Sequence, residues 1–265
     1  MKSFKSLTKF EKAWFIAFSS IILAATLWFS YTGTNYQDWK SILLNWVVSP
    51  LSALTGVACV VLVAKGNINN WWWGLINSIT YGIVAWVGGY YGDWMLNWFF
   101  FVPTQIMIFY AWRKKFENKD LGLVFKSKLT WFKGAWLIIA GITATVVLAQ
   151  FLQTADSWFF KSLARMSPFY EAVAVATGSP LLGPLMDSST VIFQVFAEIL
   201  LIMCLAEQWI FWAATNVVSI VIWAIIAIND PTSYAYSIPT LVMWVAFLIN
   251  STNGLINWYK TAKKE

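Results

Sequence analysis

The 265-residue chain has no histidine, little charge and only two cysteines. The absence of histidine excludes a Ser-His-Asp triad, a histidine general base and histidine metal ligation. Charged residues make up 11% of the chain, against roughly 25% in a typical soluble domain. Cys59 and Cys204 both lie inside apolar stretches, so we expect two free, small core residues rather than a disulfide.

Apolar residues account for 59% of the chain, which also has 19 tryptophans and 20 phenylalanines. They form runs long enough to cross a bilayer core roughly 30 Å thick. The sequence therefore predicts an all-α integral membrane protein with eight transmembrane helices. We place these helices at residues 13–31, 46–64, 71–88, 94–112, 133–152, 189–206, 209–228 and 236–258.

The distribution of lysine and arginine predicts the orientation. Eight spans place both termini on one side of the membrane. That side would hold Lys2, Lys5, Lys9, Lys12, Lys65, Arg113, Lys114, Lys115, Lys119, Lys126, Lys128, Lys133, Lys260, Lys263 and Lys264, and the other only Lys40, Lys161 and Arg165. The positive-inside rule then makes both termini cytoplasmic in a multi-pass inner-membrane protein. The basic residues after the fourth span are interpreted as a topology signal near anionic lipid, not as a nucleic-acid site.

Two parts of the chain resemble each other and predict an internal repeat. Each carries a tryptophan followed four residues later by asparagine: Trp73 with Asn77, and Trp212 with Asn216. That spacing places both side chains on one helical face. Because one linking helix separates the copies, they would point the same way, as in transporters with parallel repeats. The predicted segments are 1–45 (tail and extra helix), 46–112 (first repeat), 113–152 (basic loop and linker helix), 153–187 (external interfacial segment), 188–258 (second repeat) and 259–265 (cytoplasmic tail).

Three other features have simple structural interpretations. Trp112 and Trp258 end the third helix of each copy, where an interfacial aromatic belt is the favoured explanation. Asp187 precedes a predicted span and is interpreted as a helix N-cap.

Polar side chains inside the spans are costly unless they are paired or face a cavity. Each can join neighbouring helices or line a site, and the sequence leaves both options open. These residues are Asn77, Ser78, Asn97, Gln105, Gln194, Glu198, Asn216, Ser219, Asn250 and Asn253. Glu198 is the one carboxylate predicted well inside a span. It can be a proton or cation site, a protonated group or a structural partner; the structural role is favoured because no proton relay is evident.

Stacked indoles together with carboxamides suit a flat aromatic ligand that carries hydrogen-bonding groups. A cationic ring would gain roughly 2 kcal/mol more from cation–π attraction in a dry site. The spans contain no lysine or arginine away from their edges, so a phosphorylated ligand is disfavoured. A membrane enzyme would need an acid–base pair, a nucleophile or a metal cluster, which these residues do not provide. We therefore expect a transporter with no cofactor, rather than an enzyme or a structural protein.

The chain resembles the PnuC-type vitamin transporters. The resemblance covers about residues 46–260 and rests on NWWWGLIN (70–77), LNWFFF (96–101), Asp187-Ser188, Trp209-x2-Trp212 with Asn216 and Ser219, and Asn253-Gly254 before Trp258. It implies a three-plus-one-plus-three helix core like that of the SWEET transporters, and a homotrimer. It also implies facilitated diffusion of nicotinamide riboside, which a cytoplasmic kinase then traps by phosphorylation. Related branches carry thiamine or riboflavin, and the sequence does not separate these substrates.

The resemblance also implies which residues bind the substrate. The predicted set is Trp73, Asn77, Gln105, Glu198, Trp209, Trp212, Asn216 and Asn253. Gln105 stands where the family shows an asparagine-like amide. Pro103, close to Gln105, departs from the small residues of the family pattern.

Overall fold

The structure is a computed structural model that describes residues 7–118, 123–124, 127, 131–163 and 166–262. The cations Lys2, Lys5, Lys119, Lys126, Lys128, Arg165, Lys263 and Lys264 lie outside the described residues. The described elements are α1 (Lys9–Gly33), α2 (Trp39–Leu43), α3 (Ser49–Lys65), α4 (Asn70–Val87), α5 (Tyr91–Met95), α6 (Val102–Arg113), β1 (Phe116–Asn118), β2 (Leu123–Val124), α7 (Trp131–Ala155), α8 (Pro168–Thr177), α9 (Leu182–Ile202), α10 (Gln208–Asn229) and α11 (Tyr234–Thr261). Short π-helical segments join α2 to α3 (Leu44–Val48), join α5 to α6 (Leu96–Phe101) and extend α7 (Asp156–Phe160).

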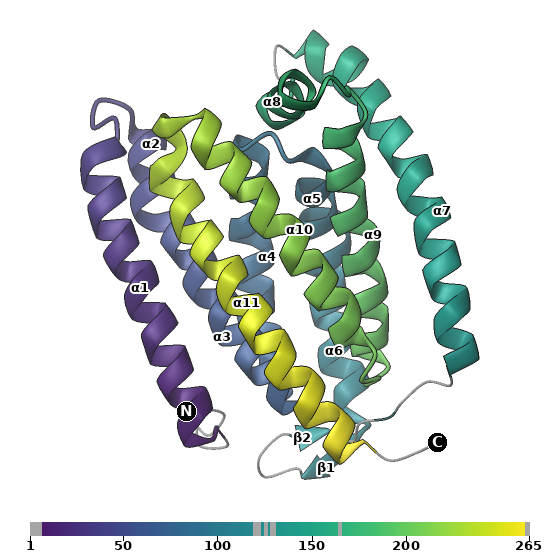
Figure 1. The fold of residues 1–265 in the computed structure, drawn as a ribbon. Helices are drawn as coiled ribbons and strands as arrows, with labels where there is room; N and C mark the ends of the chain where they lie inside the picture. Colours follow the sequence, from purple (N-terminus) through teal and green to yellow (C-terminus); the bar gives the residue numbers. More distant parts are fainter. Residues whose placement is uncertain (1–6, 119–122, 125–126, 128–130, 164–165, 263–265) are drawn as a thin grey trace.

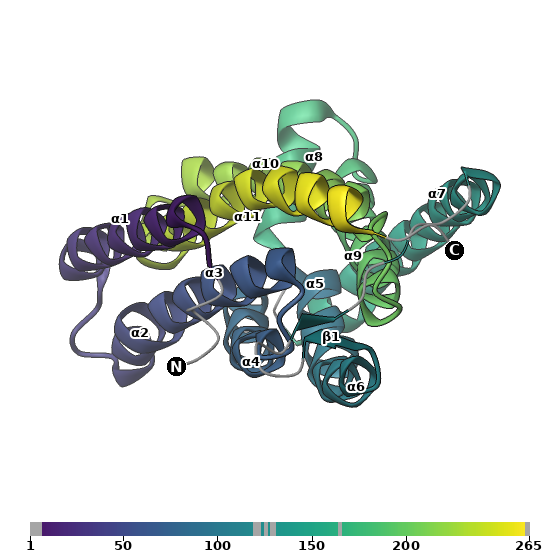
Figure 2. The same ribbon diagram turned by 90° about the horizontal axis from the view of Figure 1, so that it is seen from below.

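The long helices form one bundle, with α1 at one edge and α7 at the opposite edge (Figure 2). The described part of the chain is helical apart from one small antiparallel pair, β1 and β2. Helix α1 begins and α11 ends at the end of the bundle that carries this pair, the lower end in Figure 1. We call it the basic end, because Lys9, Lys12, Lys65, Arg113, Lys114, Lys115 and Lys260 lie there. Helix α8 lies at the opposite end (Figure 1).

Six helical segments among the described residues are long and apolar enough to cross a membrane. They are Lys9–Gly33, Trp39–Lys65, Ile139–Phe160, Leu182–Ile202, Gln208–Asn229 and Pro231–Thr261. The predicted spans 71–88 and 94–112 are helical but do not belong to this set. Their tryptophans and amides lower the mean hydropathy, although many of these side chains are buried inside the bundle. The chain is thus an all-α, multi-pass membrane protein.

Two predicted span boundaries were wrong by about two turns. The span placed at 46–64 begins at Trp39, because α2 runs through the π-helical segment into α3 without a break. The span placed at 189–206 begins at Leu182. Asp187 is therefore inside α9 and fully buried, and it is not the N-cap that the sequence suggested. The helix tolerates this carboxylate because groups from α5 and α8 donate hydrogen bonds to it.

The described parts of the segment 153–187 are largely helical. Helix α7 continues into the π-helical turn, where Asp156 accepts a 2.7 Å hydrogen bond from the Ser167 backbone N–H. The Ser167 hydroxyl donates to the Gly89 carbonyl at 2.6 Å and also caps α8 by accepting from the Tyr170 N–H. These bonds tie α8 to the turn between α4 and α5.

Two chain reversals share one backbone pattern. Gly66 ends α3 with φ 70°, and Cys204 ends α9 with φ 62°. Each corner has the two backbone hydrogen bonds of a Schellman motif. In the first corner Gly66 N–H donates to the Val63 carbonyl and Asn67 N–H to the Leu62 carbonyl. In the second, Cys204 N–H donates to the Leu201 carbonyl and Leu205 N–H to the Leu200 carbonyl. Each bond in the second corner lies 138 residues after its counterpart in the first. The two corners can therefore be aligned position by position.

Trp112 and Trp258 are fully buried, so the aromatic-belt interpretation was wrong. The Trp112 indole donates to the Leu201 carbonyl at the end of α9, at 3.0 Å. The Trp258 indole donates to the carbonyls of Val63 and Ala64 at the end of α3, both at 3.1 Å. Each third helix is thereby bound to the corner of the other half of the chain, and both indoles find the partner that a buried N–H requires.

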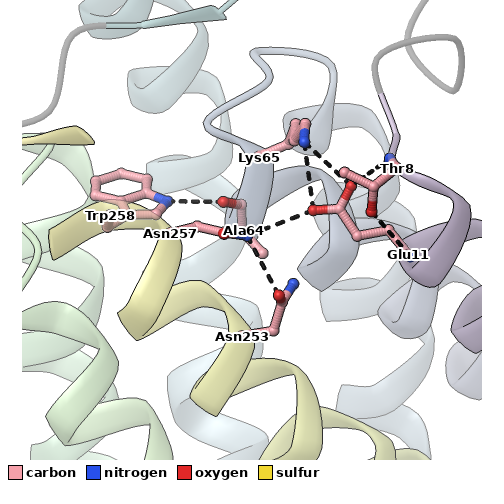
Figure 3. A network of polar contacts seen from close by, with 7 residues as sticks. All are labelled: Thr8, Glu11, Ala64, Lys65, Asn253, Asn257 and Trp258. Carbon is pink, nitrogen blue, oxygen red and sulfur yellow. Dashed lines mark hydrogen bonds and ion pairs between the residues drawn. The ribbon is translucent and has the colours of Figure 1, made fainter. Parts of the chain in front are cut away.

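A polar clamp attaches α1 to the bundle at its basic end (Figure 3). Glu11 is almost fully buried and accepts from the Thr8 N–H at 2.7 Å, closing a capping box. Its carboxylate lies 3.2 Å from the Lys65 ammonium at the end of α3. It also accepts a long, 3.5 Å hydrogen bond from the Asn257 amide on α11. Glu11 thus connects α1 to both α3 and α11.

Replacing Glu11 with alanine is expected to lower the thermal midpoint of the purified protein without changing substrate affinity. The change removes the capping-box partner of Thr8 and leaves Lys65 without its carboxylate; because Lys65 is partly exposed, we expect a loss of about 1–3 kcal/mol. Glu11→Gln is the matched control, since it removes the charge but keeps one acceptor oxygen and should lose less. An unchanged midpoint for Glu11→Ala would show that the clamp contributes nothing to stability.

Candidate functional site

A central pocket lies between α3, α4, α6, α9, α10 and α11, with about 740 Å³ of empty space when its open mouth is included. Six of the eight predicted site residues line it: Asn77, Gln105, Glu198, Trp209, Trp212 and Asn216. The structure adds Asn70, Asn97, Gln194 and Ser251 to the polar part of the wall, and Cys59, Phe101, Trp244 and Phe247 to the apolar part. Among the described residues, no three histidines, cysteines or carboxylates come together as a metal site.

Glu198 has two hydrogen-bond partners on α6. One carboxylate oxygen accepts from the Thr104 hydroxyl and from the Gln105 amide, both at 3.0 Å. Gly74 on α4 leaves the space that Gln105 occupies, because a Cβ there would collide with the Gln105 carbonyl oxygen. The Gln105 amide is thus held between Glu198 and α4, and its oxygen remains unpaired.

One wall of the pocket is aromatic. Trp209 and Trp212 come from the first turns of α10, and the Trp212 ring lies 6.2 Å from that of Phe101. Trp209 packs directly on Gly254 of α11, where any Cβ would come within 2.5 Å of the indole. A glycine at this position therefore allows the indole to reach the pocket.

The two asparagines of the repeat are held by the helices beside them. Asn77 donates to the Ser52 carbonyl of α3 at 2.9 Å. Asn216 donates to the Ser251 hydroxyl of α11 at 2.8 Å. In both cases the N–H₂ group is used for helix packing, and the Asn216 oxygen has no partner.

Several buried polar atoms of the pocket residues have no hydrogen-bond partner. The acceptors are the side-chain oxygens of Asn70, Gln105 and Asn216, and the donors are the indole N–H groups of Trp209 and Trp212. A buried polar group without a partner costs about 1–3 kcal/mol. A ligand that carries both donors and acceptors would remove this cost, which makes the pocket the candidate binding site.

Two predicted site residues lie elsewhere. Trp73 is partly buried and packs against the main hydrophobic core, but does not line the pocket. Asn253 accepts a 3.3 Å hydrogen bond from Asn257 at the polar clamp, as Figure 3 shows. The sequence indicated that both residues lie in helices, but not which face of α4 or which end of α11 turns toward the pocket.

Aligned on the two corners, Trp71 corresponds to Trp209, as both follow the corner at the same distance. The pairing of Trp73-Asn77 with Trp212-Asn216 is offset from this alignment by one residue. At the 138-residue spacing, Trp212 corresponds to Gly74. The pocket is therefore not symmetric: where α10 has an indole, α4 has a glycine, which makes room for Gln105.

The structure buries more carboxylates than the one that the sequence analysis placed inside a span. Asp93 and Asp187 are fully buried in addition to Glu198. Asp93 was placed just outside the span at 94–112, whereas α5 begins at Tyr91. The signal that could have identified them is the spacing of Asp187, Gln194 and Glu198, which lie on one face of a helix once it is extended back to Leu182.

Comparison with known proteins agrees with this geometry. The family described as nicotinamide mononucleotide transporter matches residues 45–260. The nicotinamide riboside transporter PnuC of Haemophilus influenzae is 30% identical over 96% of this chain and 92% of its own length. PnuC of Neisseria mucosa is 29% identical over 97% of this chain and 83% of its own. PnuC of Escherichia coli is 24% identical over 83% of this chain and 88% of its own.

A solved crystal structure of the vitamin B3 transporter PnuC has the same fold. It superposes with a TM-score of 0.70 at 29% identity, covering 96% of this chain and 92% of that one. The family match spans the whole pocket, from the start of the π-helical segment before α3 to the end of α11. The chain belongs to the PnuC family of membrane transporters.

Proposed function

We propose that the protein transports nicotinamide riboside by facilitated diffusion through the central pocket. The observation that carries the proposal is the set of buried, unpaired amide oxygens and indole N–H groups around that pocket. The names of the curated relatives support the same substrate.

The chemistry of nicotinamide riboside matches the pocket residues. Its pyridinium ring is a flat cation that can stack on Trp209 or Trp212. Its carboxamide donates to amide oxygens such as those of Gln105 and Asn216 and accepts from indole N–H groups. Glu198 is a carboxylate acceptor for a ribose diol and a counter-charge for the cation. Among the described residues, no lysine or arginine lines the pocket, which agrees with a ligand that has no phosphate.

A binding titration of the purified protein tests the proposal. Nicotinamide riboside, thiamine and riboflavin are added separately, and binding is followed by the fluorescence of the pocket tryptophans. We expect nicotinamide riboside to bind most tightly, because thiamine, also a flat cation, lacks the carboxamide and the diol, and riboflavin is neutral and larger. Tighter binding of thiamine or riboflavin would assign the protein to another substrate of the same family.

The arrangement in the membrane is part of the same proposal. Helix α4 and the continuous helical stretch from Tyr91 to Arg113 run alongside the long helices (Figure 1), so we propose eight spans, of which the last seven form a three-plus-one-plus-three core. The matching corners of α3 and α9 support a parallel repeat like that of the SWEET transporters. The concentration of cations at the basic end supports cytoplasmic termini in the inner membrane. The family resemblance supports a homotrimer, and a cytoplasmic kinase that traps the substrate by phosphorylation.

Uptake is expected to be independent of proton and sodium gradients. Of the described carboxylates, Glu198 alone lines the pocket, and its bonds to Thr104 and Gln105 support a role in substrate and helix contacts. In proteoliposomes, labelled nicotinamide riboside should equilibrate without accumulating, and ionophores should leave the rate unchanged. Glu198→Gln should weaken binding but keep this behaviour. Accumulation against the substrate gradient that collapses with an ionophore would contradict the prediction.

A further inference from the structure

Six carboxamide side chains among the described residues line the pocket, and all of them are held in the same sense. They are Asn70, Asn77, Asn97, Gln105, Gln194 and Asn216, and we call them the amide wall. In each of them the side-chain nitrogen donates a hydrogen bond to an acceptor of the protein itself. The oxygen lies at the other end of the amide, away from that bond.

Backbone carbonyls fix the orientation of three members of the amide wall. The donations are Asn70 to the Asn67 carbonyl at 2.8 Å, Asn77 to the Ser52 carbonyl at 2.9 Å and Asn97 to the Asp93 carbonyl at 2.8 Å. A carbonyl oxygen can only accept. Turning any of these amides over would place two oxygens against each other, so the nitrogen has to face the backbone.

The other three amides are fixed by side chains. Gln105 donates to the Glu198 carboxylate at 3.0 Å, and Gln194 donates to the Asp93 carboxylate at 2.5 Å. Asn216 donates to the Ser251 hydroxyl at 2.8 Å. That hydroxyl gives its own hydrogen to the Phe247 carbonyl at 2.9 Å, so it accepts from Asn216.

The amide wall therefore offers a ligand more acceptors than donors. Each nitrogen has spent one of its two hydrogens, whereas the oxygens of Asn70, Gln105 and Asn216 are buried with both lone pairs unused. The Glu198 carboxylate adds a negatively charged acceptor to the lining. Asp93, behind Gln194, also has an unpaired oxygen.

Free donors are concentrated at one place in the pocket, the start of α10. The indole N–H groups of Trp209 and Trp212 are buried there without a partner. The described residues place no lysine or arginine in the pocket. A ligand thus meets a small donor patch on α10 and acceptors over the amide wall.

From this arrangement we propose that the amide wall determines specificity by accepting hydrogen bonds: it selects a ligand with N–H donors and rejects the counterpart in which oxygen replaces the donor. A carboxamide suits both surfaces, because its oxygen accepts from an indole and its N–H₂ group donates to an amide oxygen. A carboxylate has two acceptor oxygens, so one of them faces the amide wall and Glu198 without a donor. The proposal rests on the transport function proposed above and adds to it the discrimination of carboxamide from carboxylate.

Nicotinamide riboside and nicotinic acid riboside are a matched pair of ligands for the test. They share the cationic ring and the ribose and differ only in carboxamide against carboxylate. Both are titrated into the purified full-length protein, and binding is followed by tryptophan fluorescence. The acid should bind at least about tenfold more weakly, because it loses a donor and brings a charge without a partner. A difference below about threefold would overturn the proposal.

Thiamine and oxythiamine form a second pair, which separates the hydrogen-bond donor from charge. Both are cations, and oxythiamine has a carbonyl oxygen where the pyrimidine ring of thiamine has an amino group. Thiamine should bind at least about fivefold more tightly than oxythiamine. Equal, measurable affinities would overturn the proposal.

The two pairs distinguish failure of the proposal from failure of the proposed function. If neither riboside binds while thiamine binds ahead of oxythiamine, the substrate is wrong and the role of the amide wall stands. If the two ribosides bind equally, the substrate stands and the role of the amide wall is overturned. If neither thiamine nor oxythiamine binds, the ribosides decide, and if none of the four ligands binds, both proposals are overturned.

Two variants test the amide wall directly. Asn216→Leu and Gln105→Met each remove one amide oxygen and keep a side chain of similar size. Loss of the oxygen that receives the carboxamide weakens binding of nicotinamide riboside more than binding of the acid. At least one variant should therefore narrow the ratio of the two dissociation constants by about fivefold or more. An unchanged ratio in both would overturn the proposal.

Asn250→Leu is the matched control for these variants. The Asn250 amide also donates to a backbone carbonyl, that of Val60, but the residue does not line the pocket. Asn250→Leu should leave the ratio of the two dissociation constants unchanged, even where it lowers stability. A ratio that narrows equally in Asn250→Leu would show that loss of helix packing, not of a pocket acceptor, causes the effect, and would overturn the proposal.

Discussion

Nicotinamide mononucleotide is expected to bind at least about a hundredfold more weakly than nicotinamide riboside, because a buried charge without a partner costs several kcal/mol. The two ligands differ by one phosphate. In the part of the chain that the structure describes, no lysine or arginine lines the pocket to receive it, and Glu198 places a carboxylate there instead. The measurement is a competition titration of both ligands against the tryptophan fluorescence of the purified protein.

This comparison distinguishes the two substrates that the matches name. The family description names the mononucleotide, and the relatives are named as riboside transporters. Glu198→Gln is the informative control, since removing the negative charge should narrow the difference between the ligands. Affinities within threefold of each other in the unmodified protein would show that the phosphate finds a cation that the pocket geometry does not contain.

Removing the pocket amide or the pocket indole is expected to weaken nicotinamide riboside binding while leaving the fold intact. Asn216→Leu leaves a ligand group unpaired and should cost about 1–3 kcal/mol, or roughly fivefold to more than a hundredfold in affinity. Trp212→Ala removes a stacking partner and should cost about 0.5–2 kcal/mol, or threefold to thirtyfold. Asn77→Leu tests the equivalent helix of the first half. Affinity and thermal midpoint are measured together for each variant.

Asn250 offers a matched control. It donates to the Val60 carbonyl at 2.8 Å, joining α11 to α3, and does not line the pocket. Asn250→Leu should therefore lower the thermal midpoint and leave affinity unchanged. If the three pocket variants behave like Asn250→Leu, these residues only hold helices together and the binding site lies elsewhere.

Sequence reasoning identified the face of α10 that turns toward the pocket. Trp209, Trp212 and Asn216 were assigned together from their spacing on α10, and all three line the pocket. Trp73 was assigned from its spacing to Asn77, and Asn253 from the family resemblance, and neither lines the pocket. A helical period shows which side chains share a face, but not toward which neighbour that face turns.

The sequence also did not show which polar and aromatic side chains are buried. Trp112 and Trp258 have the sequence context of an aromatic belt, yet both are buried against carbonyls from the opposite half of the chain. Asp187 has the sequence context of a helix cap, yet it lies inside α9 with donors from α5 and α8. The hydrogen-bond partners of these side chains lie from nearly 20 to almost 200 residues away along the chain. No local sequence pattern can therefore reveal them.

The sequence by itself determined that this is an all-α membrane protein with its cations at one end, because the bilayer constrains the length and composition of each helix directly. It also determined that no histidine chemistry operates. Only the tertiary structure decided that Gln105 meets Glu198, that Gly74 makes room for Gln105, and that Trp112 and Trp258 bind the corners of the opposite halves. These features depend on how each helix is rotated about its axis and packed against the others. That rotation is determined by side chains far apart in the sequence acting together.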